Sequence, residues 1–272
     1  MHAPRTRILS DLHYRDPGST AQSPAALNPL LRETERLVLN GDTLDTVVPS
    51  LRQHWDELRN HFKNTCAETT FISGNHDPDI SEVAELSLAD DRVWITHGDV
   101  FFDSIAPWSR QRIEIDRRLA VLREGRDAST LASVETRLHL NRVACLDLRD
   151  PEEFFHPGIL AQSRRLAHTL IPPTRILSML HTWRNTPRIV AALARAQRPR
   201  ARVVVLGHTH YPGVWRVPGR PDITVINTGS FSRPFGGLAV DVEGSSIRVV
   251  RVTRKGGEFR ASGIVADITL AD

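Results

Sequence analysis

Oxygen and imidazole side chains follow several short apolar runs of this sequence, at the points where buried strands would end. Each is an aspartate, an asparagine or a histidine, and no cysteine lies among them. The motifs are Asp11-Leu12-His13, Gly41-Asp42, Gly74-Asn75-His76-Asp77, His97-Gly98-Asp99 and Gly207-His208-Thr209-His210. Ligands collect at the carboxyl ends of strands in open α/β sheets, so we expect these motifs to meet at one rim.

Mixed carboxylate, amide and imidazole donors are typical of a hydrolytic metal site that holds manganese, iron or zinc. The candidate ligands are Asp11, His13, Asp42, Asn75, His97, His208 and His210. The lack of cysteine ligands argues against a structural zinc site of the finger type. Seven donors exceed the needs of one tetrahedral ion, which indicates two ions that share a bridging carboxylate.

Short, continuous, β-branched runs precede these motifs, as expected for buried strands. We predict strands over Thr6–Ser10, Leu37–Leu39, Thr69–Ser73, Val93–Thr96, Arg202–Leu206 and Ile223–Ile226, and a hairpin of Gly237–Val242 with Ser246–Val252. A helix is predicted over Pro49–Phe62, since proline suits a first helical turn. Helical spacing dominates Ser104–Arg200, where prolines at 151, 157, 172, 173, 187 and 199 are expected to end helices.

The composition is that of an ordinary globular protein and excludes a disordered or collagen-like chain: of 272 residues, 40% are hydrophobic and 25% charged. The net charge of +3 is too small to indicate nucleic-acid binding. The charge is unevenly distributed along the chain. Residues 104–200 hold 17 arginines and 9 acidic residues, a net charge of +8, and the rest of the chain has a net charge of −5. Two cysteines, no signal-peptide pattern and no long apolar run favour a cytoplasmic protein, with peripheral membrane contact left open.

Together and in this order, the five motifs resemble those of the calcineurin-like metallophosphoesterases, a family of binuclear hydrolases. The resemblance covers residues 8–99 and 202–230, with the helical block as an insertion. It implies an α/β fold, in which a four-layer αββα sandwich of two mixed β-sheets carries a helical cap. We therefore expect a single domain over residues 1–272, with the cap insertion at residues 104–200.

The resemblance also implies a role for each candidate residue. Asp11, His13 and His210 would hold the first metal, Asn75, His97 and His208 the second, and Asp42 would bridge both. His76 would be the catalytic histidine that is not a ligand, and Asp45 would orient it. The implied cofactors are two divalent metal ions. Mn²⁺ is the first choice of metal, and Fe and Zn are the alternatives. The implied reaction is hydrolysis of a phosphoester or pyrophosphate by in-line attack of a bridging hydroxide.

The blocks Gly41–Asp45 and His97–Asp103 are similar to those of the UDP-diacylglucosamine hydrolase branch, which implies a lipid-linked pyrophosphate substrate at the inner membrane. This chain departs from that branch at His76, where the branch carries arginine. The alternatives are a nucleotide or dinucleotide polyphosphate hydrolase and a cyclic phosphodiesterase. A nuclease would need a long basic groove, and a non-catalytic scaffold would have lost metal ligands.

Arginines of the cap are candidates for binding substrate phosphate, because guanidinium matches phosphate geometry. Arg110, Arg112, Arg117 and Arg118 follow soon after the His97 motif and are our first choices. Other residues have simpler interpretations. Asp77 is expected to be a structural acceptor at a turn. Trp108 and Trp183 are expected to pack in the helical core, with cover for a base or an acyl chain as the alternative. Asn227–Ser230 is expected to support the site.

Overall fold

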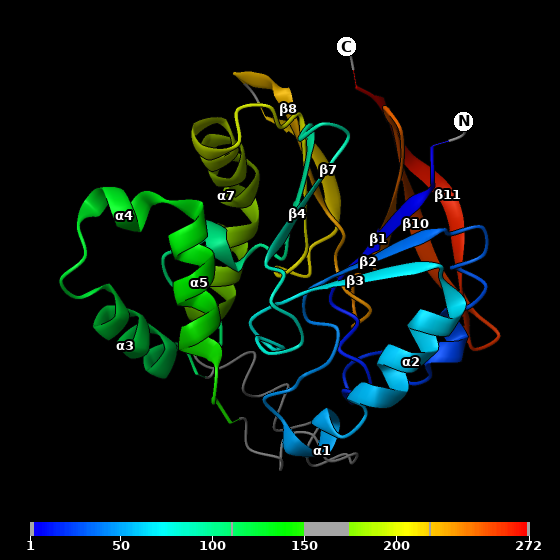
Figure 1. The fold of residues 1–272 in the computed structure, drawn as a ribbon, viewed down its shortest axis with the longest axis horizontal. Helices are drawn as coiled ribbons and strands as arrows, with labels where there is room; N and C mark the ends of the chain where they lie inside the picture. The colour runs from blue at the N-terminus through cyan, green and yellow to red at the C-terminus, as the bar shows by residue number, and fades with distance from the viewer. Residues whose placement is uncertain (1–2, 110, 150–173, 218, 271–272) are drawn as a thin grey trace.

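Two mixed β-sheets form the centre of the computed structural model, which describes residues 3–109, 111–149, 174–217 and 219–270 (Figure 1). The first sheet has the order β11-β10-β9-β1-β2-β3 and the second the order β4-β5-β6-β8-β7. The first comprises β1 (Thr6–Leu9), β2 (Arg36–Asn40), β3 (Glu68–Ile72), β9 (Leu238–Glu243), β10 (Ser246–Lys255) and β11 (Glu258–Thr269). The second comprises β4 (Glu85–Leu88), β5 (Val93–Thr96), β6 (Val203–Leu206), β7 (Gly213–Val217) and β8 (Arg220–Asn227).

A parallel core within each sheet positions the motifs. In the first sheet β1 pairs in parallel with β2, and β2 with β3. In the second sheet β5 pairs in parallel with β6, and β6 with β8. Parallel neighbours end at the same edge, so the residues that follow each strand are delivered to one rim of the molecule.

Apolar side chains fill the space between the sheets and hold them face to face. Ile8 and Val38 of the first sheet belong to one buried cluster with Val205 and Ile226 of the second. Helices cover the two outer faces (Figure 1). Short α1 (Pro49–Arg52) and α2 (Trp55–Thr65) lie beside the first sheet, and α5 (Val134–Cys145) and α7 (Thr174–Gln197) lie beside the second. This is the four-layer αββα sandwich that the sequence predicts.

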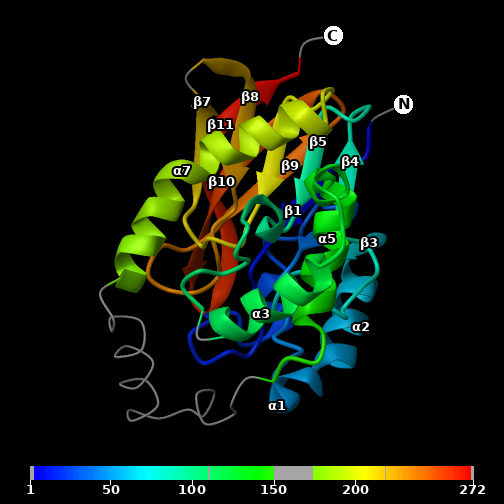
Figure 2. The same ribbon diagram turned by 90° about the vertical axis from the view of Figure 1, so that its left-hand side faces the viewer.

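Within the predicted cap insertion, residues 104–200, the structure describes α3 (Arg112–Arg123), α4 (Ala128–Ala132), α5 and α7. Side-chain caps fix two of their starts. Asp127 accepts from the backbone N–H of Thr130 at 2.8 Å, and Ser133 accepts from that of Thr136 at 3.4 Å. Figure 2 shows α3, α5 and α7 together on one side of the sheets. Residues 150–173, with four of the predicted helix-ending prolines, lie outside the described residues.

Two helical predictions are wrong in detail. The predicted helix Pro49–Phe62 is divided into α1 and α2. Conversely, Pro187 does not end a helix, because α7 continues through it. Its ring costs one backbone hydrogen bond, but Thr186, Val190 and Ala191 on both sides of that turn are buried. This packing offsets the local loss.

The strands that the sequence analysis missed are β4, β7 and β11, and all three lie at sheet edges. Each of the three mixes polar with apolar residues, so the short apolar runs typical of buried strands do not identify it. In β11, for example, most residues are partly or fully exposed. None of the described helices combines the length and the apolar character that crossing a membrane requires.

Candidate metal centre

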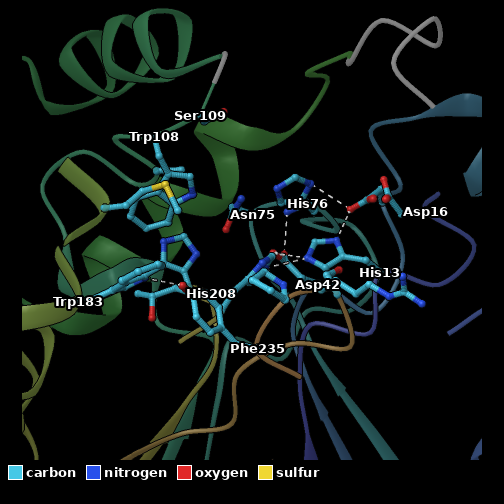
Figure 3. Close-up of a pocket in the computed structure, with 18 of the residues that line it drawn as sticks. His13, Asp16, Asp42, Asn75, His76, Trp108, Ser109, Trp183, His208 and Phe235 are labelled. Atoms are coloured by element: carbon cyan, nitrogen blue, oxygen red, sulfur yellow. Dashed lines mark hydrogen bonds and ion pairs between the residues drawn. The ribbon is translucent and has the colours of Figure 1, made fainter. Parts of the chain in front are cut away.

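Short turns after β1, β2 and β6 aim the candidate ligands at a common point (Figure 3). The backbone there adopts positive φ at non-glycine residues. The angle is 50° at Asp11, 43° at His13, 50° at Asp42, 65° at His208 and 57° at His210. Such left-handed residues are uncommon and cost free energy, which folded proteins tolerate chiefly at functional sites.

A first group of donor atoms comes from Asp11, His13, Asp42 and His210, and all lie within 4.8 Å of one another. Nε2 of His210 is 3.1 Å from Oδ1 of Asp11 and 3.1 Å from Nε2 of His13. Nε2 of His13 is 3.8 Å from Oδ2 of Asp42. The first predicted ligand set is therefore assembled at one place.

A second group comes from Asp42, His97 and His208, within the same 4.8 Å limit. Nε2 of His97 is 3.4 Å from Oδ2 of Asp42 and 3.2 Å from Nδ1 of His208. Oδ1 of Asn75 adds an oxygen 3.2 Å from Nε2 of His97. Asp42 belongs to both groups, as a bridging carboxylate must.

Hydrogen bonds on the outer side of the rings show that this donor set fits cations. Nδ1 of His97 is 3.2 Å from the carbonyl of Asn40, and Nε2 of His208 is 2.7 Å from that of Ile105. A nitrogen that donates to a carbonyl leaves the other nitrogen of a neutral ring with a lone pair. When both rings are neutral, the inward nitrogens of His97 and His208 therefore face each other as acceptors, and a cation between them would take the place of a proton.

Charge is concentrated among the buried ligands. Burial opposes ionisation of Asp42, but His97 and His76 outweigh it and hold the pKa of Asp42 well below its usual range. Burial also opposes the charged form of His97, yet Asp42 raises the pKa of His97 to about 10. For His208, burial and then the charge of His97 lower the pKa to about 3. His208 is thus held as a neutral imidazole, the form that binds metals.

Asp45 contacts two imidazoles at once. Its Oδ1 is 2.8 Å from Nδ1 of His13 and 3.0 Å from Nδ1 of His76. Burial alone would raise the pKa of Asp45, but these two rings hold it below its usual value. Burial also opposes the charge on His13, and Asp45 raises the pKa of His13 to about 9. The structure therefore adds His13 to the pairing of Asp45 with His76 that the resemblance implied.

Supporting residues lie beneath the ligands. Asp77 accepts from the backbone N–H groups of Gly74 at 2.7 Å, Thr43 at 2.7 Å and Asp42 at 3.0 Å, which confirms its predicted structural role. Burial, and then the negative charge of Asp42, raise the pKa of Asp77 to about 7. From the predicted supporting segment, Ser230 donates to the carbonyl of Asp11 at 3.1 Å.

The ligands form the floor of a pocket of about 450 Å³. Figure 3 shows His76 and Asp16 on one side of it, and Trp108, Trp183 and Phe235 around the rest. Trp108 and Trp183 line this pocket, so they are not confined to the helical core as the sequence analysis expected. The sequence analysis did not identify Phe235 as a pocket residue, because nothing in the neighbouring sequence distinguishes it from a residue of an ordinary surface loop.

The arginines in the pocket are not those chosen from the sequence. Arg117 and Arg118 lie 2.8 Å from Glu114, and Arg112 lies 3.6 Å from Asp116, all on α3. Arg110 lies outside the described residues. Among described residues the pocket-lining arginines are Arg175 and Arg233. Arg175 shares one face of α7 with Met179 and Trp183, and this four-residue spacing was the signal that could have identified it.

A family model described as Calcineurin-like phosphoesterase matches residues 4–212. The chain therefore belongs to the calcineurin-like phosphoesterase family, and its ligand clusters fit divalent metal ions. No curated protein matches the sequence.

Three solved structures are similar at low sequence identity. A predicted phosphoesterase from Streptococcus pneumoniae is 14% identical, with 96% of this chain and 98% of that chain covered and a TM-score of 0.42. Vacuolar Protein Sorting 29 from Cryptosporidium parvum is 12% identical, with 99% and 100% covered and a TM-score of 0.43. A dimetal phosphatase from Danio rerio is 11% identical, with 99% of each chain covered and a TM-score of 0.45.

Proposed function

We propose that this chain is an enzyme that hydrolyses a phosphoester or diphosphate bond with two divalent metal ions. Mn²⁺ is our first choice of metal. The observation that carries the proposal is the sharing of Asp42 between two donor groups at the floor of one pocket. One group is Asp11, His13, Asp42 and His210, and the other is Asp42, His97 and His208 with the nearby oxygen of Asn75. Oxygen and imidazole donors suit Mn²⁺, with iron and zinc as alternatives.

Two ions held there would lower the pKa of a water between them and polarise the phosphoryl oxygens of the substrate. The residues around them supply position and protons. His76 lines the pocket with Nδ1 3.0 Å from Oδ1 of Asp45, and a protonated His76 ring beside the metal centre could donate to a phosphoryl or leaving-group oxygen. The negative charge of Asp45 favours the protonated ring that this step requires.

A narrower form of the proposal is a UDP-diacylglucosamine-type diphosphate at a membrane surface. Its support is the exposure of Leu177 and Leu180, 65% and 50%, on the helix that lines the pocket. Exposed apolar side chains on a cationic helical cap suit peripheral contact with anionic lipid. A nucleotide polyphosphate or a cyclic phosphodiester is the alternative substrate within the same reaction class.

The test uses metal-stripped protein reloaded with Mn²⁺, Fe²⁺ or Zn²⁺. We expect about two ions per chain by elemental analysis, and ion-dependent turnover of bis(p-nitrophenyl) phosphate. Asp42→Asn should lose both, whereas the control Asp90→Asn, at an exposed turn, should keep both. One ion per chain with full activity, or activity without any ion, would contradict the proposal.

A substrate panel then narrows the reaction. It contains a phosphomonoester, a cyclic phosphodiester, a dinucleotide polyphosphate and a UDP-linked diacylated sugar. Release of UMP from the last of these, faster than any other turnover, would select the lipid-linked diphosphate. Preference for the dinucleotide would remove the lipid from the proposal while leaving the metal-dependent hydrolysis intact.

A further inference from the structure

The walls of the pocket differ in chemistry. Its floor consists of the charged and imidazole side chains of the metal centre. The side that Figure 3 shows around Trp108, Trp183 and Phe235 is aromatic instead, and Met179 also lines the pocket. The proposed hydrolysis needs the metal centre and His76, so the rings on this side are left without a role in bond cleavage.

The rings of Trp183, Tyr211 and Trp215 form a stack beside this wall. Trp183 lies nearly parallel to Tyr211, with ring centroids 4.8 Å apart and planes inclined by 14°. Tyr211 continues the stack to Trp215, with centroids 6.2 Å apart and an angle of 21°. Phe235 stands edge-on to Trp183 at 5.4 Å and 89°. Trp183 lines the pocket but Tyr211 and Trp215 do not, so Trp183 is the pocket-side end of the stack.

The stack is fixed relative to the metal centre. Nε1 of Trp183 donates to the carbonyl of Thr209 at 2.9 Å, and Thr209 stands between the candidate ligands His208 and His210. The rings are not simply part of a core, because Tyr211 is 36% and Phe235 45% exposed. Rigid aromatic surface that stays open to solvent beside a pocket is typical of a binding site.

Cationic side chains flank the same wall. Arg175 lies two helical turns before Trp183 on α7, and Arg233 lies two residues before Phe235. Guanidinium groups bind phosphate oxygens well. The pocket thus combines the candidate metal centre on its floor with two arginines and a flat aromatic surface in its lining.

We propose that Trp183 and Phe235 form a subsite for a nucleobase, so that the substrate is a nucleotide phosphoester or nucleotide-linked diphosphate. This inference rests on the proposed function. A planar base can continue the stack on Trp183, with Phe235 against its edge. An acyl chain gains nothing from parallel ring planes, and a pocket of about 450 Å³ suits one nucleotide better than a polymer.

The test measures binding rather than turnover. Calorimetry on the Mn²⁺-loaded full chain compares α,β-methylene-UDP and α,β-methylene-ADP with methylenediphosphonate, which lacks the nucleoside. Since base–aromatic stacking accounts for much of such affinity, we expect at least one nucleotide analogue to bind about tenfold tighter. Trp183→Leu and the exposed Phe235→Leu should each remove most of that preference. Trp183→Phe should retain it, and Trp55→Leu, outside this pocket, should leave it unchanged.

Equal affinity for the nucleotide analogues and methylenediphosphonate would overturn the subsite. The subsite would also be overturned if dodecylphosphonate binding depended on Trp183 while nucleotide binding did not. Tighter binding of a single-stranded DNA decamer than of both nucleotide analogues would overturn it as well. Continued Mn²⁺-dependent hydrolysis of bis(p-nitrophenyl) phosphate would then leave the proposed function standing. Conversely, nucleotide binding through Trp183 without hydrolysis of any phosphoester would defeat the proposed function alone.

Discussion

Oδ1 of Asp45 lies 2.8 Å from Nδ1 of His13, so a buried carboxylate holds one of the proposed metal ligands from behind. The same oxygen lies 3.0 Å from Nδ1 of His76. A single carboxylate therefore orients a ligand of the metal and the proposed proton donor. In the proposed mechanism, metal affinity and proton transfer are therefore coupled through this one side chain.

Asp45→Asn should weaken both functions. Loss of the negative charge removes the acceptor that fixes the ring of His13, and partners of this kind are worth about 10–100-fold in metal affinity. We expect the dissociation constant for Mn²⁺ to rise within that range and kcat to fall even at saturating Mn²⁺. Calorimetric Mn²⁺ titration and steady-state kinetics measure the two effects. Unchanged Mn²⁺ affinity would show that His13 does not depend on Asp45.

His76→Ala should separate the two functions. Because we assign His76 no metal, the variant should retain about two Mn²⁺ ions per chain while kcat falls by about 10²-fold or more, the range typical of general acid catalysis. His181→Ala, an exposed histidine of α7, is the matched control and should change neither. Loss of one ion from the His76 variant would instead make His76 a ligand with Asp45.

The convergence of the candidate ligands could be predicted from sequence because each of them follows a parallel strand. Strand order need not be known for this, since all such ends reach one rim whichever strands are neighbours. Asp11 and His208, almost 200 residues apart in the chain, meet for this reason, and the backbone N–H of His208 donates to Asp11 at 3.0 Å.

The pocket walls could not be predicted in the same way. The charge count of the cap identifies an arginine-rich segment but not which arginines face the pocket. Arg117 and Arg118 pair with Glu114 at helical spacing and stay on the surface of α3. The ring pair of Trp183 and Phe235 joins α7 to a loop after β8, and no local pattern encodes that meeting.

Gly207→Ala should disturb the candidate metal centre although it replaces none of the candidate ligand residues. A Cβ at Gly207 would overlap the Asp11 carboxylate and the Ser10 hydroxyl. Overpacking of this kind costs about 1–3 kcal/mol and should displace Asp11. We expect fewer than two Mn²⁺ ions per chain and a lower melting temperature. Gly237→Ala is the control, because its Cβ would meet its nearest neighbours at 3.5 Å, an ordinary contact. If the Gly207 variant retained two ions, Asp11 and Ser10 would be able to move enough to accommodate the added Cβ.

Asp241→Asn should destabilise the first sheet. Asp241 of β9 lies opposite Arg7 of β1 and accepts two hydrogen bonds from its guanidinium, at 2.6 and 2.7 Å. The Arg7 side chain is 3% exposed, so the variant leaves a buried cation without its charge partner. Breaking such a pair costs about 3–5 kcal/mol. Urea unfolding at pH 7 measures the loss, and Asp267→Asn, in an exposed pair with Arg248, should leave stability nearly unchanged.

The destabilisation by Asp241→Asn should also depend on pH. Burial would raise the pKa of Asp241, but the hydrogen bonds from Arg7 outweigh it and hold the pKa below the ordinary 3.8. A carboxyl whose pKa is lower in the folded state stabilises the protein fully above the unfolded-state pKa, and less as the pH falls through the folded-state value. The stability gap between wild type and variant should therefore be constant from pH 7 to about pH 5 and narrow below about pH 4. A gap that widens on acidification would mean that Asp241 is protonated in the folded protein and that Arg7 is held by the carbonyl of Leu30 instead.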